Sequence, residues 1–377
     1  MKHLTQKNPE PPKLNARIKI HKTNNPIRPV VNNTKAPTYR IAKKLNYILK
    51  QQLTNQYNTQ NPENFAHNIT KLKINEHHRM ITYDIKDLYV NIPIEETLTI
   101  TKQQLLINND IHKTEQIITC LRTILNQNYF EFQNNIYHPK NGIAMGSPIS
   151  GTIAEILLQH IENQHVKHLI EAGNITYYTR YVDDIFIVYD NTKTTIENIQ
   201  AFTDHIHKNL KFTITQETNE QISFLDILIT RQEQKLDINI YRKNTTTDTT
   251  INYLSNHPME HKMAAYRYYI NRMNRLPLSE KNRTIEWQTI LRIAHNNNFP
   301  TRKITTLRKQ IERNNAATKQ QRSTERQKNK WTTFTYYTPK IRKITNLFKN
   351  TDINIAFKSN NSIQRITNLD TTNETEK

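Results

Sequence analysis

The chain has 377 residues and a formal net charge of +20, from 53 Lys and Arg against 33 Asp and Glu. This excess of positive charge favours a polyanionic partner such as nucleic acid. A single cysteine, Cys120, excludes an intramolecular disulfide and any zinc site built from several cysteines. No apolar run approaches the roughly 18 residues of a membrane-spanning helix, so we expect no membrane partner and an intracellular protein.

The N-terminal part predicts a basic hairpin followed by a helix. Residues 1–15 are polar and proline-rich and predict a disordered lead-in. ARIKIHKTNNPIRPVV (16–31) alternates apolar and basic residues on either side of a TNNP turn, which is typical of a hairpin. In APTYRIAKKLNYILKQQL (36–53) the apolar residues recur at helical spacing.

The middle of the chain alternates strand and helix patterns. Met80–Tyr83 predicts a short apolar strand that ends at Asp84, and Pro93 stands near the start of the following helix. FEFQNNIYHP (130–139) predicts a hairpin that turns at QNN, and 152–170 predicts a strong amphipathic helix.

The stretch ITYYTRYVDDIFIVY (175–189) predicts two strands with Asp183 and Asp184 at or near the turn between them. Further strand patterns continue to about residue 243, and the pattern becomes helical beyond residue 256. The stretch 301–350 carries fourteen Lys and Arg but only two acidic residues, as expected of a surface that binds nucleic acid.

The adjacent acids in RYVDDIFIVY need an explanation, because strands are depleted in Asp and like charges repel. If the strand that ends at Asp84 lies beside them, the carboxylates of Asp84, Asp183 and Asp184 converge at one edge of a sheet. Such a cluster suits two Mg²⁺ ions roughly 3.5–4 Å apart. The alternative is that YVDD is only a polar turn between two strands.

Glycine is rare in this chain, and three of its four glycines lie within NGIAMGSPISG. Gly146 is expected to permit close approach of the backbone to a nucleobase or template, beside the hydroxyl of Ser147. The alternative is a helix N-terminus that Ser150 or Thr152 caps. Both interpretations remain open.

In this order the motifs resemble those of reverse transcriptases, and their wording is closest to the Penelope-like retroelement family. The matching segments, which span about residues 16–365, are KIHKTNNPIRPV, DIKDLYVNIP, GIAMGSPIS, RYVDD, FLDILI, YRKNTTTDTTINYLSNHPMEHK and INIAFKSNNSI. Many members carry a GIY-YIG nuclease after the last segment, and we expect this chain to lack it.

The resemblance implies an α+β right-hand polymerase fold with fingers, a palm built on an antiparallel sheet, and a helical thumb. The implied domains are a disordered lead-in (1–15), fingers and palm (16–256), a basic helical thumb (257–345) and a C-terminal connector or tail (346–377).

For the nucleotide site, the resemblance implies that Asp84, Asp183 and Asp184 are the catalytic residues and bind two Mg²⁺ ions, for which Mn²⁺ can substitute. Lys22 and Arg28 would reach the triphosphate, although without the resemblance they indicate only a solvated basic hairpin. Tyr89 would lie beneath the sugar and exclude a ribose 2′-hydroxyl. The alternative is that Tyr89 is only an aromatic residue packed at the start of a helix. Gly146 and Ser147 would complete the nucleotide site.

The resemblance also implies five contacts with nucleic acid, at Arg180, Tyr181, Lys243, His257 and Lys262. His257 and His261 have the i, i+4 spacing of some metal sites, but no third ligand is apparent.

The implied function is RNA-directed DNA synthesis in the nucleus, with an RNA template, a DNA primer and dNTPs. Two alternatives are a catalytically idle nucleic-acid-binding remnant of a retroelement, and a DNA-templated or template-independent polymerase with the same three aspartates.

Overall fold

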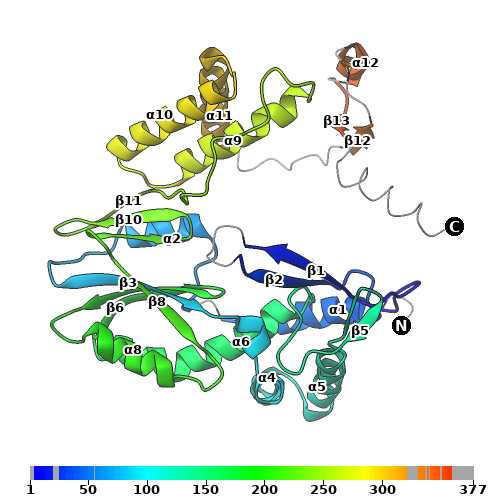
Figure 1. Cartoon of the computed structure of the whole chain (residues 1–377), viewed down its shortest axis with the longest axis vertical. Coiled ribbons are helices and arrows are strands. Elements are labelled where there is room, and N and C mark those ends of the chain that lie inside the picture. The colour runs from blue at the N-terminus through cyan, green and yellow to red at the C-terminus, as the bar shows by residue number, and fades with distance from the viewer. Residues whose placement is uncertain are drawn as a thin grey trace. The chain divides into compact units, whose positions relative to one another are not determined.

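The computed structural model describes residues 4–19, 25–54, 56–320, 330–335, 338, 340–348 and 350–358. The chain divides into two compact units, Met1–Thr245 and Thr246–Lys377, which are described here one at a time (Figure 1). The sequence boundary at residue 256 therefore differs from the structural one. The reason is that Asn297 of the helical unit binds the preceding segment, accepting hydrogen bonds from the backbone N–H of Tyr253 (3.0 Å) and of Thr250 (2.9 Å).

The centre of the first unit is a four-stranded antiparallel sheet with the order β6-β7-β3-β8. Its strands are β3 (His78–Ile85), β6 (Ile175–Tyr181), β7 (Asp184–Asp190) and β8 (Phe212–Gln216). Successive side chains of a strand point to opposite faces, and both faces are covered here, which explains why most residues of β7 are buried.

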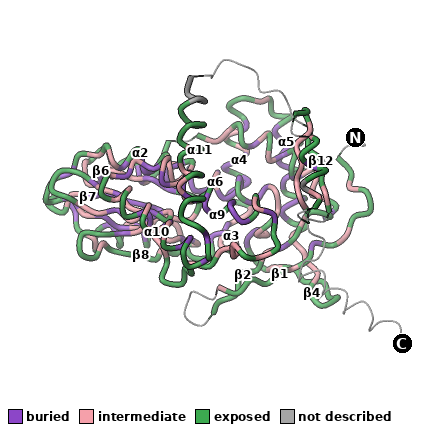
Figure 2. Tube along the Cα trace, turned by 90° about the horizontal axis from the view of Figure 1, so that it is seen from above, coloured by how far each residue is buried: buried purple, intermediate pink, exposed green. Residues whose placement is uncertain are grey.

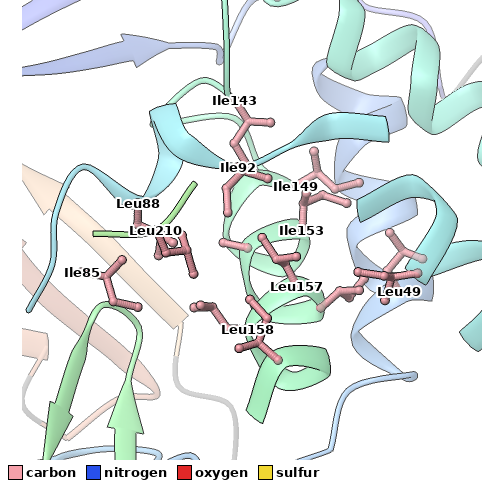
Figure 3. Packing of buried hydrophobic residues seen from close by; sticks show 14 of the residues in the cluster. Leu49, Ile85, Leu88, Ile92, Ile143, Ile149, Ile153, Leu157, Leu158 and Leu210 are labelled. Atoms are coloured by element: carbon pink, nitrogen blue, oxygen red, sulfur yellow. The ribbon is translucent and has the colours of Figure 1, made fainter. Parts of the chain in front are cut away.

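One face of this sheet packs on α6 (Ser150–Ile161), which continues through a π-helical turn, η1 (Glu162–Val166), into α7 (Lys167–Glu171). The predicted helix over 152–170 is thus present but changes its winding near the middle. The apolar residues of α6, with Ile85 at the end of β3, form the core that Figure 3 shows. α8 (Ile196–His205) adds Ile199 to the same core.

The other face of the sheet packs on α2 (Pro62–Ile69) and on a small sheet with the order β11-β10-β9. The small sheet consists of β9 (Gln221–Phe224), β10 (Ile227–Arg231) and β11 (Leu236–Ile240). The ring of Phe65 meets Phe186 of β7 at 5.2 Å and Phe224 of β9 at 4.8 Å between centroids, so aromatic packing joins the two sheets.

A third sheet, with the order β2-β1-β4-β5, corresponds to the predicted hairpins. It contains β1 (Lys13–Ile18), β2 (Ile27–Asn32), β4 (Phe130–Phe132) and β5 (Asn135–Tyr137). The helices of this region are α1 (Tyr39–Lys50), α3 (Leu88–Asn91), α4 (Ile94–Asn108) and α5 (Ile111–Asn126). β1 and β2 are largely exposed, whereas α6 is buried along most of its length (Figure 2).

The disordered lead-in predicted for residues 1–15 is wrong over its second half. β1 begins at Lys13, and the segment before it is held by backbone hydrogen bonds. The N–H of Glu10 donates to the carbonyl of Lys35 (3.0 Å), and the carbonyl of Pro12 accepts from Glu131 (2.7 Å). Partners more than twenty residues away order this segment, which local composition does not reveal.

The second unit contains the helices predicted after residue 256: α9 (Met259–Arg275), α10 (Glu280–Asn296) and α11 (Thr301–Gln320). The remaining elements are β12 (Lys330–Phe334), α12 (Ile341–Thr345), the 3₁₀ turn η2 (Asn346–Phe348) and β13 (Ile353–Phe357), with β12 and β13 paired in parallel. Among the described residues, none of the helices is both long and apolar enough to span a bilayer.

Candidate active site

Three acidic residues lie at one end of the central sheet. Asp84 of β3 lies directly opposite Asp184 of β7, and residues in such cross-strand pairs have Cβ atoms about 4.5–5.5 Å apart. Asp183 occupies the two-residue turn between β6 and β7, and its carbonyl accepts a hydrogen bond from the N–H of Ile85 (2.9 Å). The structure therefore brings the three predicted aspartates together, although the strand that was expected to end at Asp84 continues for one more residue, to Ile85.

The turn that carries Asp183 is strained. Val182 has φ 57°, a conformation that is rare for a β-branched residue and costs about 1–3 kcal/mol. The flanking strands impose it, because Tyr181 pairs with Asp184 across the turn.

Burial raises the pKa of the Asp183 carboxyl, and the charge of Asp84 raises it further. The positive charges of Arg28 on β2 and of Lys19 beside β1 act to lower the pKa of Asp183. Both cations therefore lie within electrostatic reach of this carboxylate. Carboxylate oxygens are the ligands that Mg²⁺ prefers, and the donor chemistry fits such an ion. Within the part of the chain that the structure describes, however, no three His, Cys, Asp or Glu side chains already form a metal-binding group.

Tyr89 lies close to these acids. It belongs to the short helix α3, where burial raises the pKa of its hydroxyl and the charge of Asp183 adds to that effect. Its carbonyl accepts from the N–H of Ile143 (2.8 Å), and Gly142 packs directly against the same backbone. A Cβ on Gly142 would stand 2.4 Å from the Cα of Val90, so this glycine lets the GIAMGSPIS segment support α3.

The backbone at Gly146 lies very close to another segment of the same chain, the strand β2. A Cβ added there would stand 2.2 Å from the carbonyl oxygen of Val31 on β2, and its φ is +119°. The neighbouring Met145 carbonyl accepts from the N–H of Val31 (2.8 Å). The segment is therefore fastened to the basic hairpin. Contact of Gly146 or Ser147 with a nucleotide stays a prediction.

Neither predicted helix cap is present. Ile149 is the N-cap residue of α6, and no side chain caps it. The hydroxyl of Ser150 donates to the carbonyl of Ala144 (2.7 Å), and that of Thr152 donates to Asn46 of α1. The two hydroxyls therefore connect α6 to the loop at Ala144 and to α1, and they do not cap the N-terminus of α6.

Residues 20–255 match the family described as Reverse transcriptase (RNA-dependent DNA polymerase). This chain belongs to the reverse transcriptase family. Residues 249–309 also match the family described as Animal helix-turn-helix domain. Comparison with curated protein sequences found no match.

Among solved structures, the chain is similar to telomerase from Candida albicans in complex with a fragment of telomeric RNA, with 11% identity and a TM-score of 0.57. That match covers 79% of this chain and 58% of the telomerase chain. Apo telomerase from Candida tropicalis gives 12% identity and a TM-score of 0.51, with 78% of this chain and 60% of that chain covered. This chain thus spans about three fifths of these telomerases, and the predicted right-hand polymerase fold is confirmed.

In this reverse transcriptase, Arg180 does not face nucleic acid, so the predicted contact is wrong. Its side chain is 1% exposed and lies against α6 and η1. The guanidinium donates to Glu162 (2.7 Å from Nε) and to Glu155 (2.8 Å from Nη2). Burial acts to lower the pKa of Arg180, but the two carboxylates outweigh it and hold the pKa above its usual value. Arg180 pairs with Ile185 across the hairpin and so shares the helix-facing side of the sheet.

The same guanidinium supports the turn that carries Asp183. Its Nη1 donates to the carbonyl of Val182 (3.1 Å), the strained residue that precedes Asp183. Arg180 therefore connects that turn to the two glutamates.

Lys262 is also buried, so its predicted nucleic-acid contact is wrong. Its ammonium donates to the carbonyl of Tyr253 (2.7 Å) and lies over the ring of the same residue. By contrast, Tyr181, Lys243 and His257 are exposed, and their contacts stay predictions. Lys22 lies outside the described residues.

Sequence reasoning missed three residues of this site. Lys19 was overlooked beside Arg28, although both belong to the basic hairpin. Glu155 and Glu162 were overlooked because they seemed part of an ordinary amphipathic helix. Their spacing of seven residues, which places two acids on one helix face, was a usable signal for a buried cation.

Substitution of Gly146 by Ala is expected to lower the free energy of unfolding by about 1–3 kcal/mol, because the new methyl group collides with the Val31 carbonyl at a positive φ. Denaturant unfolding measures this change. Gly151→Ala is the matched control, since its Cβ meets nothing within 4 Å and α6 tolerates alanine. Equal stability of the two variants would contradict the fastening of this segment to β2.

Proposed function

We propose that this reverse transcriptase is the RNA-directed DNA polymerase of a Penelope-like retroelement, which extends a DNA primer on an RNA template with dNTPs. The observation that carries the proposal is the meeting of Asp84, Asp183 and Asp184 at the end of β3 and β7. The order of the seven sequence motifs supports the Penelope-like assignment.

Each part of the site has a distinct task in this proposal. Asp84, Asp183 and Asp184 would hold two Mg²⁺ ions, which supply charge neutralisation and activation of the primer hydroxyl. Arg28 and Lys19 place positive charge beside the carboxylates, where a triphosphate binds. This positioning is the main requirement of phosphoryl transfer.

Primer extension by the purified chain tests the proposal. An oligo(dT) primer is annealed to poly(rA) or to poly(dA), and incorporation of dTTP is measured with Mg²⁺ or Mn²⁺ and with EDTA. We expect extension on the RNA template that EDTA abolishes. Extension on poly(dA) alone would indicate a DNA-templated enzyme, and extension without a template would indicate terminal transfer.

A second candidate function is that of a catalytically idle nucleic-acid-binding remnant. The observation that favours it is that no ready group of three metal ligands exists among the described side chains. Binding of the hybrid without extension under every metal condition would support this candidate over the polymerase.

Tyr89 is proposed to select the sugar of the incoming nucleotide. Tyr89→Ala is expected to raise rNTP incorporation relative to dNTP by roughly 10- to 100-fold, because the ring no longer excludes the 2′-hydroxyl. Competition between rUTP and dTTP during extension measures the ratio. Tyr181→Ala, an exposed tyrosine beside Asp184, is the control and should leave the ratio unchanged. An unchanged ratio in the Tyr89 variant would remove Tyr89 from this task.

A further inference from the structure

A small cavity lies within the first unit, between the central sheet and the helices α6, η1 and α8, and its volume is about 40 Å³. Most of its wall consists of apolar side chains, among them Ile85, Leu158, Ile185, Ile199, Phe202 and Leu210. Figure 3 labels three of these residues, Ile85, Leu158 and Leu210. A water-sized sphere needs about 10–15 Å³, so the cavity has room for about three such spheres. It can therefore hold a molecule of about three or four non-hydrogen atoms.

One polar group in this wall has no partner. Tyr83 of β3 is 2% exposed, and its hydroxyl forms no hydrogen bond within the described part of the chain. Burial raises the pKa of this hydroxyl, and the neighbouring Thr203 offsets that effect only in part, so the hydroxyl keeps its proton. The hydroxyl of Thr203 is already engaged with the carbonyl of Gln200 (2.9 Å). An acceptor inside the cavity would thus satisfy a buried donor that is otherwise left unpaired.

Water is a poor occupant of this cavity, because a buried water typically makes about three hydrogen bonds. The other polar side chains of the wall are used within the protein. Arg180 donates to Glu162 and Glu155, and the hydroxyl of Tyr178 donates to Glu162 (2.9 Å). A wall with one unpartnered donor among apolar side chains favours an apolar molecule with one acceptor.

Two residues of the wall also hold the turn that carries Asp183. The N–H of Ile85 donates to the carbonyl of Asp183 (2.9 Å), and Nη1 of Arg180 donates to the carbonyl of Val182 (3.1 Å). An empty cavity leaves the side chains of this wall without packing partners on one side. An occupant would supply those contacts and would restrain the strained turn from below.

We propose that this cavity binds a compact, largely apolar molecule with one hydrogen-bond acceptor, such as a small ether or ketone, and that its occupancy speeds DNA synthesis by restraining the Asp183 turn. The effect on synthesis rests on the proposed polymerase function, whereas the binding site does not. Catalytic groups act best when the surrounding packing fixes their positions. For a ligand of four non-hydrogen atoms, the dissociation constant cannot be lower than roughly 40 µM.

Binding is tested by NMR on the full chain, labelled with ¹³C at the δ1 methyl groups of isoleucine. The chain is titrated with xenon, dimethyl ether and propane, in the absence of primer and dNTP. We expect saturable shifts at Ile85 and Ile185, whereas Ile69 and Ile290, which are buried elsewhere, should not shift. Tyr83→Phe keeps the ring and removes only the donor. It should weaken binding of dimethyl ether about fivefold relative to propane, which matches it in size but has no acceptor.

The effect on synthesis is tested with a saturating RNA–DNA hybrid and saturating dTTP. Xenon under pressure should raise the single-turnover extension rate at least about twofold. Helium at the same pressure is the control, since its dispersion attraction to the wall is negligible. Val166→Ile adds a methyl group to the wall of the cavity at η1, and it should abolish both the binding of xenon and the response of the rate.

Each part of the proposal has an outcome that would overturn it. The binding site is wrong if the wall methyl groups show no saturable shift, or if Ile69 and Ile290 shift equally. Equal weakening of dimethyl ether and propane in Tyr83→Phe would remove the acceptor from the description of the ligand. Binding of xenon with an unchanged extension rate would refute the effect on the turn. The methyl shifts decide the site even in a chain that extends no primer, so failure of the proposed polymerase function is distinguishable from failure of this inference.

Discussion

Asp183→Asn is expected to abolish nucleotide incorporation, by at least about 10³-fold, while the affinity for a primer–template hybrid stays within a few-fold of native. The amide keeps the size of the carboxylate but loses the charge that a metal ion requires. The hydrogen bond that the backbone carbonyl of residue 183 accepts from the N–H of Ile85 does not involve the side chain, so the substitution leaves it unchanged. Turn geometry and duplex contacts are therefore retained.

Single-turnover extension measures incorporation, and fluorescence anisotropy of the labelled hybrid measures affinity. Asp190→Asn is the matched control, because it removes the same charge from the opposite end of β7, about 20 Å away. The control should extend the primer at nearly the native rate. Equal loss of binding and incorporation in a folded Asp183 variant would contradict the assignment of Asp183 to the metal site.

Arg180→Met is expected to lower the free energy of unfolding by about 3–5 kcal/mol. Methionine preserves much of the side-chain volume, but Glu155 and Glu162 then lose the guanidinium that compensates their buried charge. The carbonyl of Val182 loses its donor as well, so the turn that carries Asp183 is less well supported. We therefore expect slower extension even at temperatures where the variant remains folded.

Urea unfolding measures the stability change, and two further variants separate its causes. Arg180→Met/Glu155→Gln/Glu162→Gln should recover much of the lost stability, because no unpaired charge remains. Arg122→Met breaks an exposed pair with Glu95 of similar length (2.8 Å) and should leave stability almost unchanged. Stability of Arg180→Met equal to that of Arg122→Met would show that the buried network is not stabilising.

Most elements near the site were predictable because their patterns are local. The hairpin over 130–139 follows from the alternation on either side of QNN, and Gln133 and Asn134 both have the positive φ that such a tight turn needs. The π turn that interrupts the helix over 152–170 was not predictable, since nothing in the apolar spacing marks it.

Arg180 shows why part of the site was misread. As the first residue of the RYVDD motif, it was expected to contact nucleic acid. Strand alternation instead places it with Tyr178 on the helix-facing side, and Tyr181 on the side of Asp184. The decisive partners, Glu155 and Glu162, lie 25 and 18 residues away, and only the packing of α6 under the sheet brings them to the guanidinium.

Residue types and the order of the motifs were enough to predict the chemistry available to this protein. A basic hairpin, a glycine-containing segment and paired aspartates in an apolar hairpin follow one another along the chain. Their resemblance to reverse transcriptase motifs predicted the right-hand polymerase fold. Which polar groups face solvent and which support the fold depends on the packing of distant segments against one another. Packing directs Arg180 and Lys262 inward and sets Gly146 against Val31. The physical reason is that residue type and periodicity are local properties, whereas burial and charge compensation depend on contacts between distant segments.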